Sequence, residues 1–235
     1  YRGKINMLIG PNGSGKTTAL NLITGVYKVT EGKNYFIDDG KYVDITNMQP
    51  HVITSLAMAR TFQNIYLFEG QSVIENLMCA YYCRMKSNVF DIGVRTPRFY
   101  REERVARELA CELLDFVGLY DKRDATPADL PYGHRRLVEI ARAMMTKPKL
   151  LMLDEASAGM NPAEASELMD IMFKIRDKGV TIFAIEHNMH IVMSVAEHIT
   201  VINFGKMIAE GSPDEISKND DVIDIYLGRK VHAKS

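Results

Sequence analysis

The chain has 235 residues, of which 46% are hydrophobic and 25% are charged, and its formal net charge is -1 at pH 7. This composition suits one large domain, or one domain with an inserted subdomain, and it excludes a disordered chain. The near-neutral charge provides no overall basic field for nucleic acid, and no apolar run approaches the ~20 residues that a membrane-spanning helix needs.

The first predicted unit is a strand, a glycine-rich loop and a helix. Residues 4–9 predict a buried strand, and residues 16–26 predict the helix that follows. Between them a glycine at position 10, four residues and then Gly-Lys-Thr at 15–17 match the P-loop pattern. Glycines in such a loop let backbone N–H groups surround a phosphate, and the helix adds the positive end of its dipole. A plain Pro-Asn-Gly turn would not explain a Gly-Lys-Thr-Thr ending fused to a helix start.

We therefore predict that this loop binds the phosphates of a nucleotide. Lys16 is placed to reach the outer phosphates, and the Thr17 hydroxyl is placed to ligate Mg²⁺. The residues expected to bind the nucleotide are Asn12, Gly13, Ser14, Gly15, Lys16, Thr17 and Thr18.

Short elements follow the first helix. Residues 35–37 lie between turn residues and predict a small hairpin, and residues 50–59 predict a short helix. Arg-Thr-Phe-Gln at 60–63 then leads into an aromatic stretch that ends at Phe68.

Residues 68–131 predict only helices. Ser72 and Glu75 have the capping-box spacing, so a helix that reaches Cys83 should begin there. Apolar residues recur at helical spacing over 100–117, and the next residue is a glycine where a C-terminal cap belongs.

Strands and helices alternate in the rest of the chain. The predicted elements are helices over 137–146 and from Asn161 to Gly179, strands over 149–155, 180–185 and 199–203, and short helices near Asp214 and Asp220. This alternation, broken by one helical insert, predicts an α/β fold in which a P-loop core with a mainly parallel sheet carries an inserted α-helical subdomain. We expect the core in residues 1–67 and 135–235, and the helical subdomain in residues 68–134.

Two carboxylates end the apolar run at 149–155. Asp154 is expected to hold Mg²⁺ together with Thr17, because ligands in open α/β sheets bind at the carboxyl ends of the strands. Glu155 is then next to the terminal phosphate and is expected to orient or activate the attacking water. A solvated acidic loop would explain the pair alone, but the P-loop upstream favours the metal site.

These motifs together resemble those of the ATP-binding cassette (ABC) transporter ATPases. Gln63 matches the glutamine of the Q-loop in that family, and His187 matches its switch histidine. Leu-Pro-Tyr-Gly-His at 130–134 aligns with the Leu-Ser-Gly-Gly-Gln signature, and residues 158–161 fall at the D-loop. The resemblance implies a RecA-like core and a Walker B pair, with Thr17, Gln63 and Asp154 around Mg²⁺ and Glu155, His187 and Gln63 as the catalytic residues.

Within the family, the chain is most similar to the LivG-type ATPases of branched-chain amino acid importers. The similar stretches are 60–64, 132–133 followed by 139–142, 158–162 and Tyr-Leu-Gly at 226–228. Importers of urea and related small solutes have similar motifs, so the resemblance leaves the solute open.

The resemblance also implies the partners of the chain. Two ABC ATPases, identical or different, form a head-to-tail dimer around ATP, and Tyr132, Gly133 and His134 would face the ATP on the partner's P-loop. Permease subunits in the membrane would bind this dimer and receive solute from a binding protein. The three cysteines, without a signal peptide, favour a reducing compartment, so we expect a cytoplasmic protein peripheral to the inner face of the cell membrane.

The chain departs from the family pattern at four places, of which Ala156, in place of a proline, changes no chemistry. Pro131 lacks the serine hydroxyl that contacts phosphate, and His134 replaces glutamine. Tyr1 lies only a few residues before the P-loop strand, whereas family members have a longer upstream segment with an aromatic residue that stacks on adenine. We therefore expect a chain that is truncated at its N-terminus.

The predicted function is ATP hydrolysis that powers import. A hydrolytically weak nucleotide-binding fragment is an alternative, because of Pro131 and the short N-terminus. An ABC machine that acts on DNA would need a long coiled-coil insertion or a basic face, and the sequence shows neither. A P-loop kinase for small molecules would have no use for a signature helix or a switch histidine.

Overall fold

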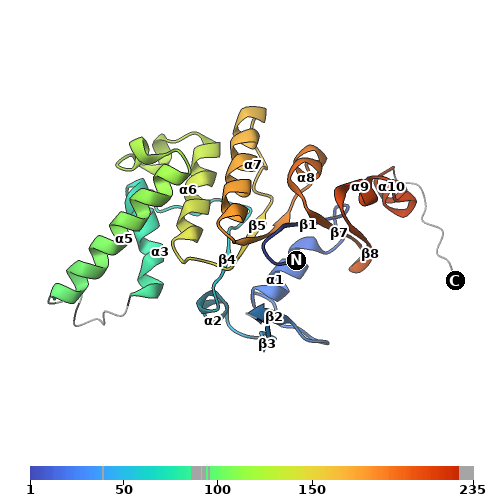
Figure 1. Ribbon diagram of the computed structural model, residues 1–235, viewed down its shortest axis with the longest axis horizontal. Helices are drawn as coiled ribbons and strands as arrows, with labels where there is room; N and C mark the ends of the chain where they lie inside the picture. The colour runs from blue at the N-terminus through green and yellow to red at the C-terminus, as the bar shows by residue number, and fades with distance from the viewer. Residues whose placement is uncertain (39, 86–90, 92–93, 95, 228–235) are drawn as a thin grey trace.

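The computed structural model describes residues 1–38, 40–85, 91, 94 and 96–227, and a six-stranded sheet forms its centre (Figure 1). The strand order is β4-β5-β6-β1-β7-β8, and β8 alone is antiparallel to its neighbour. The strands are β1 (Ile5–Ile9), β4 (Met58–Arg60), β5 (Leu150–Asp154), β6 (Thr181–Ile185), β7 (His198–Asn203) and β8 (Lys206–Gly211). A separate antiparallel hairpin joins β2 (Tyr35–Asp38) and β3 (Lys41–Asp44).

The central strands β1 and β5 are buried on both faces because helices cover both. On one face Met7, Leu151 and Leu153 pack in a core that includes residues of α6 (Tyr132–Met144), α7 (Pro162–Asp177) and α8 (Met189–Val195). On the other face Leu8 and Met152 pack with residues of α1 (Lys16–Ile23) and α2 (Pro50–Ser55). Alternate side chains of a parallel strand thus enter opposite cores, which explains the near-continuous apolar runs in the sequence.

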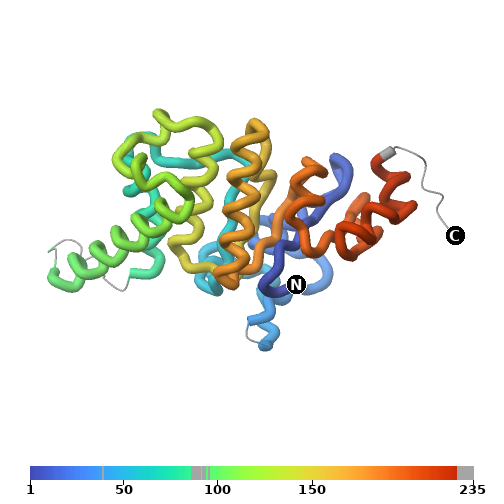
Figure 2. Tube along the Cα trace, turned by 45° about the horizontal axis from the view of Figure 1, so that its top comes forward, coloured from blue at the N-terminus to red at the C-terminus, as the bar shows by residue number. Residues whose placement is uncertain are grey.

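A group of helices lies at one end of the molecule, and the C-terminal helices lie at the other (Figure 2). The first group comprises α3 (Val73–Tyr81), α5 (Pro97–Phe116) and the turns η1 (Tyr82–Arg84), η2 (Tyr120–Lys122) and η3 (Pro127–Asp129). The second comprises α9 (Pro213–Ser217) and α10 (Asp220–Leu227). Among the residues described, no helix has the length and apolar character required to cross a membrane.

The structure confirms the four buried strands that the sequence predicts and corrects several boundaries. The helix expected over 50–59 ends at Ser55, and Met58–Arg60 is an edge strand paired with β5. Three residues are too few to show the alternation of a strand, so no sequence pattern predicts β4. The strand β8 is likewise absent from the prediction, because its exposed Lys206 and Met207 lack the alternation of a half-buried strand.

Helix ends also differ from expectation. α1 stops at Ile23, α3 stops at Tyr81, and α6 begins at Tyr132, directly after the Pro131 N-cap. The three-segment division of the chain stays a prediction, and α6 runs unbroken across its boundary at residue 134. Gly228, part of the Tyr-Leu-Gly similarity, lies outside the described residues.

Asn76 of α3 is fully buried and joins this helix to the segment before it. The Asn76 Oδ1 accepts a hydrogen bond from the Phe68 N–H at 2.7 Å, and its Nδ2 donates to the Phe68 carbonyl at 3.0 Å. The same Nδ2 also donates to the Ser72 carbonyl at 3.0 Å. The amide is thus the partner of the Phe68 N–H and a second donor to the Phe68 and Ser72 carbonyls, which also accept from the N–H groups of Gln71 and Asn76.

We expect Asn76→Ala to lower the free energy of unfolding by about 1–3 kcal/mol, because the partly buried Phe68 N–H loses its acceptor. Urea denaturation measures this change. Asn64→Ala, at an exposed residue, is the control, with an expected change within about 0.5 kcal/mol. Equal stabilities for Asn76→Ala and the parent would contradict the role of this amide.

Candidate functional site

The P-loop connects β1 to α1, and its glycines are required by the backbone. A Cβ at Gly10 would lie 2.1 Å from the Ile202 carbonyl oxygen, so only glycine fits there. Gly15 is the N-cap of α1 with a φ of 102°, a left-handed conformation that glycine adopts without strain. No side chain caps the start of α1, and its first turn has no acidic residue, so the first N–H groups of the helix are available to an anion.

Lys16 is buried with its ammonium directed into the loop. Its Nζ donates to the carbonyl oxygens of Gly10 at 2.8 Å and Pro11 at 3.0 Å. Burial lowers the pKa of Lys16, and the negative charge of Glu155 opposes this shift. A neutral carbonyl oxygen forms a weaker hydrogen bond with an ammonium than a charged phosphate oxygen does. The Lys16 ammonium is therefore a suitable ligand for phosphate.

The parallel pairing brings the predicted catalytic residues together at the carboxyl edge of the sheet. Leu8 of β1 and Asp154 of β5 both pair with Ile185 of β6, so the three strands end at one level. Gln63 follows β4, and His187 follows β6. The side chains of both residues reach Glu155.

Glu155 is the common partner in this group. The Gln63 Nε2 donates to the Glu155 Oε2 at 3.0 Å, and the His187 Nε2 lies 2.8 Å from the same oxygen. Glu155 itself has a φ of 49°, a left-handed conformation that is strained for a residue with a side chain. The Glu155 N–H donates to the Ile185 carbonyl at 2.9 Å and thereby fixes this turn to β6.

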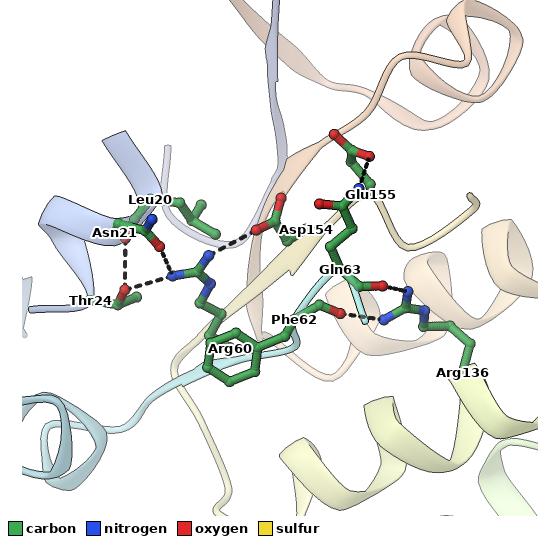
Figure 3. A network of polar contacts seen from close by, with 9 residues as sticks. All are labelled: Leu20, Asn21, Thr24, Arg60, Phe62, Gln63, Arg136, Asp154 and Glu155. Carbon is green, nitrogen blue, oxygen red and sulfur yellow. Dashed lines mark hydrogen bonds and ion pairs between the residues drawn. The ribbon is translucent and has the colours of Figure 1, made fainter. Parts of the chain in front are cut away.

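Asp154 is buried, and Arg60 neutralises its charge (Figure 3). The Arg60 Nη2 donates to the Asp154 Oδ2 at 2.8 Å. Among the described residues, the Asp154 Oδ1 and the Ser14 Oγ are buried without a hydrogen-bond partner. A buried unpaired oxygen is costly, and Mg²⁺ or its bound water would satisfy it, so the residues present fit a magnesium ion.

The signature residues lie apart from this group. Within the described residues, no hydrogen bond or ion pair joins Tyr132, Gly133 or His134 to the P-loop. Instead the Gly133 N–H donates to the Glu164 Oε1 at 3.2 Å, so the start of α6 contacts a carboxylate of the same chain. Tyr132 is partly exposed and lies against Gly159, and the Nδ1 of His134 is buried without a partner in the described part of the chain.

Several residues that support this site belong to no motif in the sequence. The Glu186 carboxylate accepts hydrogen bonds from the N–H of Ser157 at 3.0 Å and from its hydroxyl at 2.7 Å. This contact joins the loop after β5 to the neighbour of His187. Burial raises the pKa of Glu186, while the hydrogen bonds from Ser157 lower it. A glutamate directly after a buried strand was the available signal, because a buried carboxylate needs donors.

Arg136 of α6 is a second missed residue. It is fully buried, and its guanidinium donates to the carbonyl oxygens of Phe62 and Gln63, both at 2.6 Å (Figure 3). The same guanidinium pairs with Glu139 at 2.6 Å. Arg136 therefore attaches the signature helix to the backbone of the Q-loop residue itself.

Comparisons with known proteins agree with this architecture. The profile of the ABC transporter family matches residues 1–158, and that of the branched-chain amino acid ATP-binding cassette transporters matches residues 206–232. A crystal structure of the ADP conformation of MJ1267, an ATP-binding cassette of an ABC transporter, has a TM-score of 0.81 and 34% identity, covering 97% of this chain and 89% of that one. The predicted fold, a P-loop α/β cassette with a mainly parallel sheet, is thus confirmed.

Two relatives are branched-chain amino acid transport ATP-binding proteins. BraF of Pseudomonas aeruginosa is 43% identical over 94% of this chain and 86% of its own length. LivG of Escherichia coli K12 is 40% identical over 97% of this chain and 88% of its own length. With the family profile and the cassette fold, these similarities show that the chain belongs to the ABC transporter family and is an ABC-type ATPase whose activity is coupled to transport.

Proposed function

We propose that this chain is the ATP-hydrolysing subunit of an importer for branched-chain amino acids. The observation that carries the solute class is the family match at residues 206–232, which covers β8, α9 and α10. The similarity to BraF and LivG supports the same solute class. An importer of urea or another small solute is the alternative, because the permease and the binding protein select the solute.

ATP binding is assigned to the P-loop. The N–H groups at the start of α1 and the Lys16 ammonium bind the phosphates, and Lys16 exchanges its carbonyl acceptors for phosphate oxygens. Asp154, Thr17 and Gln63 are the proposed Mg²⁺ ligands, and the unpaired Asp154 Oδ1 supports this assignment. When bound, Mg²⁺ would neutralise the charge that develops on the phosphates.

Glu155 is the proposed general base. It accepts a proton from the water that attacks the γ-phosphorus, the bond from phosphorus to the bridging oxygen breaks, and ADP and phosphate leave. Gln63 and His187 both contact the Oε2 of Glu155, so the carboxylate is oriented before a water arrives. The backbone strain at Glu155 supports a functional role, since strained residues cluster at active sites.

The proposed active form is a head-to-tail dimer in which Tyr132, Gly133 and His134 complete the partner's site. The Gly133 N–H is directed at the Glu164 carboxylate, which indicates that the start of α6 prefers an anion. A Cβ at Gly133 would lie 2.6 Å from the Glu164 Cδ, so a substitution at Gly133 would disturb the subunit itself. Pro131 is exposed at the N-cap and is the better place for a test.

The Q-loop is the proposed contact with the permease. A cavity of about 220 Å³ lies beside it, between residues 64–69 and residues 127–135. Tyr66 and Phe68 are exposed next to this cavity, as an apolar partner surface requires. Binding there would keep a cytoplasmic subunit at the inner face of the membrane and would couple the permease to Gln63.

We expect Glu155→Gln to slow hydrolysis on the order of 10²–10⁴-fold while ATP still binds, because the amide keeps the shape but loses the basicity. Trapped ATP should then shift the protein from monomer to dimer in sedimentation. Hydrolysis at the parent rate would show that Glu155 is not the base.

Pro131 provides a matched pair of second substitutions in the Glu155→Gln chain. Serine and aspartate are both good N-caps, so α6 should remain folded in both variants. Pro131→Ser should preserve the ATP-dependent dimer, whereas Pro131→Asp should abolish it, because a carboxylate would face the partner's phosphate. Equal dimerisation of the two variants would contradict contact between the signature and the partner's nucleotide.

The strain at Glu155 is testable separately. We expect Glu155→Gly to be more stable than Glu155→Ala by about 0.5–1 kcal/mol in urea denaturation, since glycine tolerates the left-handed conformation. At Glu167, exposed within α7, the same two substitutions should rank in the opposite order. If alanine is also the more stable residue at position 155, the turn is not strained.

The solute is tested by reconstituting the chain with a permease that it binds and measuring ATP-dependent uptake of labelled leucine and labelled urea. Leucine uptake that disappears in Glu155→Gln supports the proposal. Uptake of urea without leucine would assign the alternative, and hydrolysis without uptake of either solute would contradict both.

A further inference from the structure

Arg60, the last residue of β4, joins three parts of the site through one side chain (Figure 3). Its Nη2 donates to the Asp154 Oδ2 at 2.8 Å. Its Nη1 donates to the Asn21 Oδ1 at 2.7 Å and to the Thr24 hydroxyl at 2.9 Å. One guanidinium therefore connects the strand that ends in Asp154 to the last turn of the helix that follows the P-loop.

The guanidinium is enclosed and electrostatically matched. The side chains of Arg60 and Asp154 are only 7% and 3% exposed, so each charge depends on the other for neutralisation. Asn21 and Thr24 lie at the C-terminal end of α1, where the helix dipole favours a cation. The Arg60 Cζ also lies 5.0 Å from the centre of the Phe62 ring, within the range of a cation–π contact.

This arrangement distinguishes the two oxygens of Asp154. Arg60 contacts Oδ2, while Oδ1 is buried and has no hydrogen-bond partner among the described residues. A carboxylate fixed through one oxygen cannot rotate freely, so Oδ1 is presented in a constant direction. The planar fork of arginine makes this possible because separate nitrogens reach Asp154 and α1 at once, which a lysine ammonium does with far less directional control.

Arg60 also begins the segment that carries Gln63. The two residues contact the adjacent carboxylates Asp154 and Glu155, respectively. At the other end of segment 60–63, Arg136 binds the carbonyl oxygens of Phe62 and Gln63. The segment is therefore fixed by one buried arginine of its own and by one from α6.

We propose that Arg60 is a positioning residue that orients the Asp154 carboxylate so that Oδ1 faces the divalent cation. This inference rests on the proposed role of Asp154 as a Mg²⁺ ligand. The competing explanation is that Arg60 is only a counter-charge for a buried aspartate. The two explanations differ for Arg60→Lys, which keeps the charge and loses the fork.

The test measures the affinity of the ADP-loaded chain for Mn²⁺ by electron paramagnetic resonance. The affinity for ADP in EDTA and the temperature of thermal unfolding are measured in parallel. Arg60→Lys should weaken Mn²⁺ binding about 10-fold, the lower end of the loss expected when the outer-shell partner of a metal ligand is changed, while ADP affinity in EDTA stays unchanged. Arg176→Lys is the matched control, because Arg176 pairs with Asp177 and Glu197 away from the P-loop.

The outcomes separate the inference from the proposed function. Unchanged Mn²⁺ affinity in a folded Arg60→Lys would overturn the positioning role. Tighter Mn²⁺ binding in Arg60→Met would also overturn it, since the charge of Arg60 would then only repel the cation. Asp154→Asn should abolish the Mn²⁺ site, and if it does not, the metal role of Asp154 fails regardless of Arg60.

Discussion

The site depends on the register between parallel strands at the centre of the sheet. Leu8 and Asp154 pair with the same residue of β6, so the loops that follow β1, β5 and β6 emerge side by side. Parallel strands place all their carboxyl ends at one edge of the sheet. Residues distant in sequence therefore meet at that edge because of the strand pairing, and contacts between the loops are not needed to bring them together. A shift of β5 by one residue would move Asp154 to the opposite face and separate it from the P-loop.

Burial of charge at this edge explains how the site is organised. Lys16, Arg60, Asp154 and Glu186 are all taken out of water, and each must find a partner within the protein. Arg60 and Asp154 neutralise each other, Glu186 is bound by donors of Ser157, and Lys16 uses loop carbonyls. Of these four groups, Lys16 is the cation whose hydrogen-bond partners carry no charge. A phosphate would therefore give its ammonium a stronger, charged acceptor.

The features that the sequence predicted are those with a local cause. Buried strands appear as apolar runs, the caps at Ser72 and Asn161 follow from side-chain spacing, and the P-loop needs its glycines. The missed strand β8 pairs locally with β7, whereas the missed strand β4 and the missed partners within the site depend on contacts distant in sequence. β4 is a strand because it pairs with β5, and the partners of Arg60 are 39, 36 and 94 residues away. No local pattern records such contacts, although a charged residue at the end of a buried strand indicates that a partner exists.

The Gly133 N–H, which is proposed to bind a partner's ATP, has an acceptor within its own chain. Glu164 accepts hydrogen bonds from the N–H groups of both Gly133 and Asn161, so a single carboxylate satisfies the starts of α6 and α7. A phosphate carries more charge than a carboxylate and offers more acceptors, and it would compete for the Gly133 N–H. Glu164 can release that N–H and still cap α7 through Asn161, because the capping box is complete without Gly133. In the proposed dimer, an exchange of the Gly133 N–H from Glu164 to a partner's phosphate would therefore leave no group of α7 unpaired.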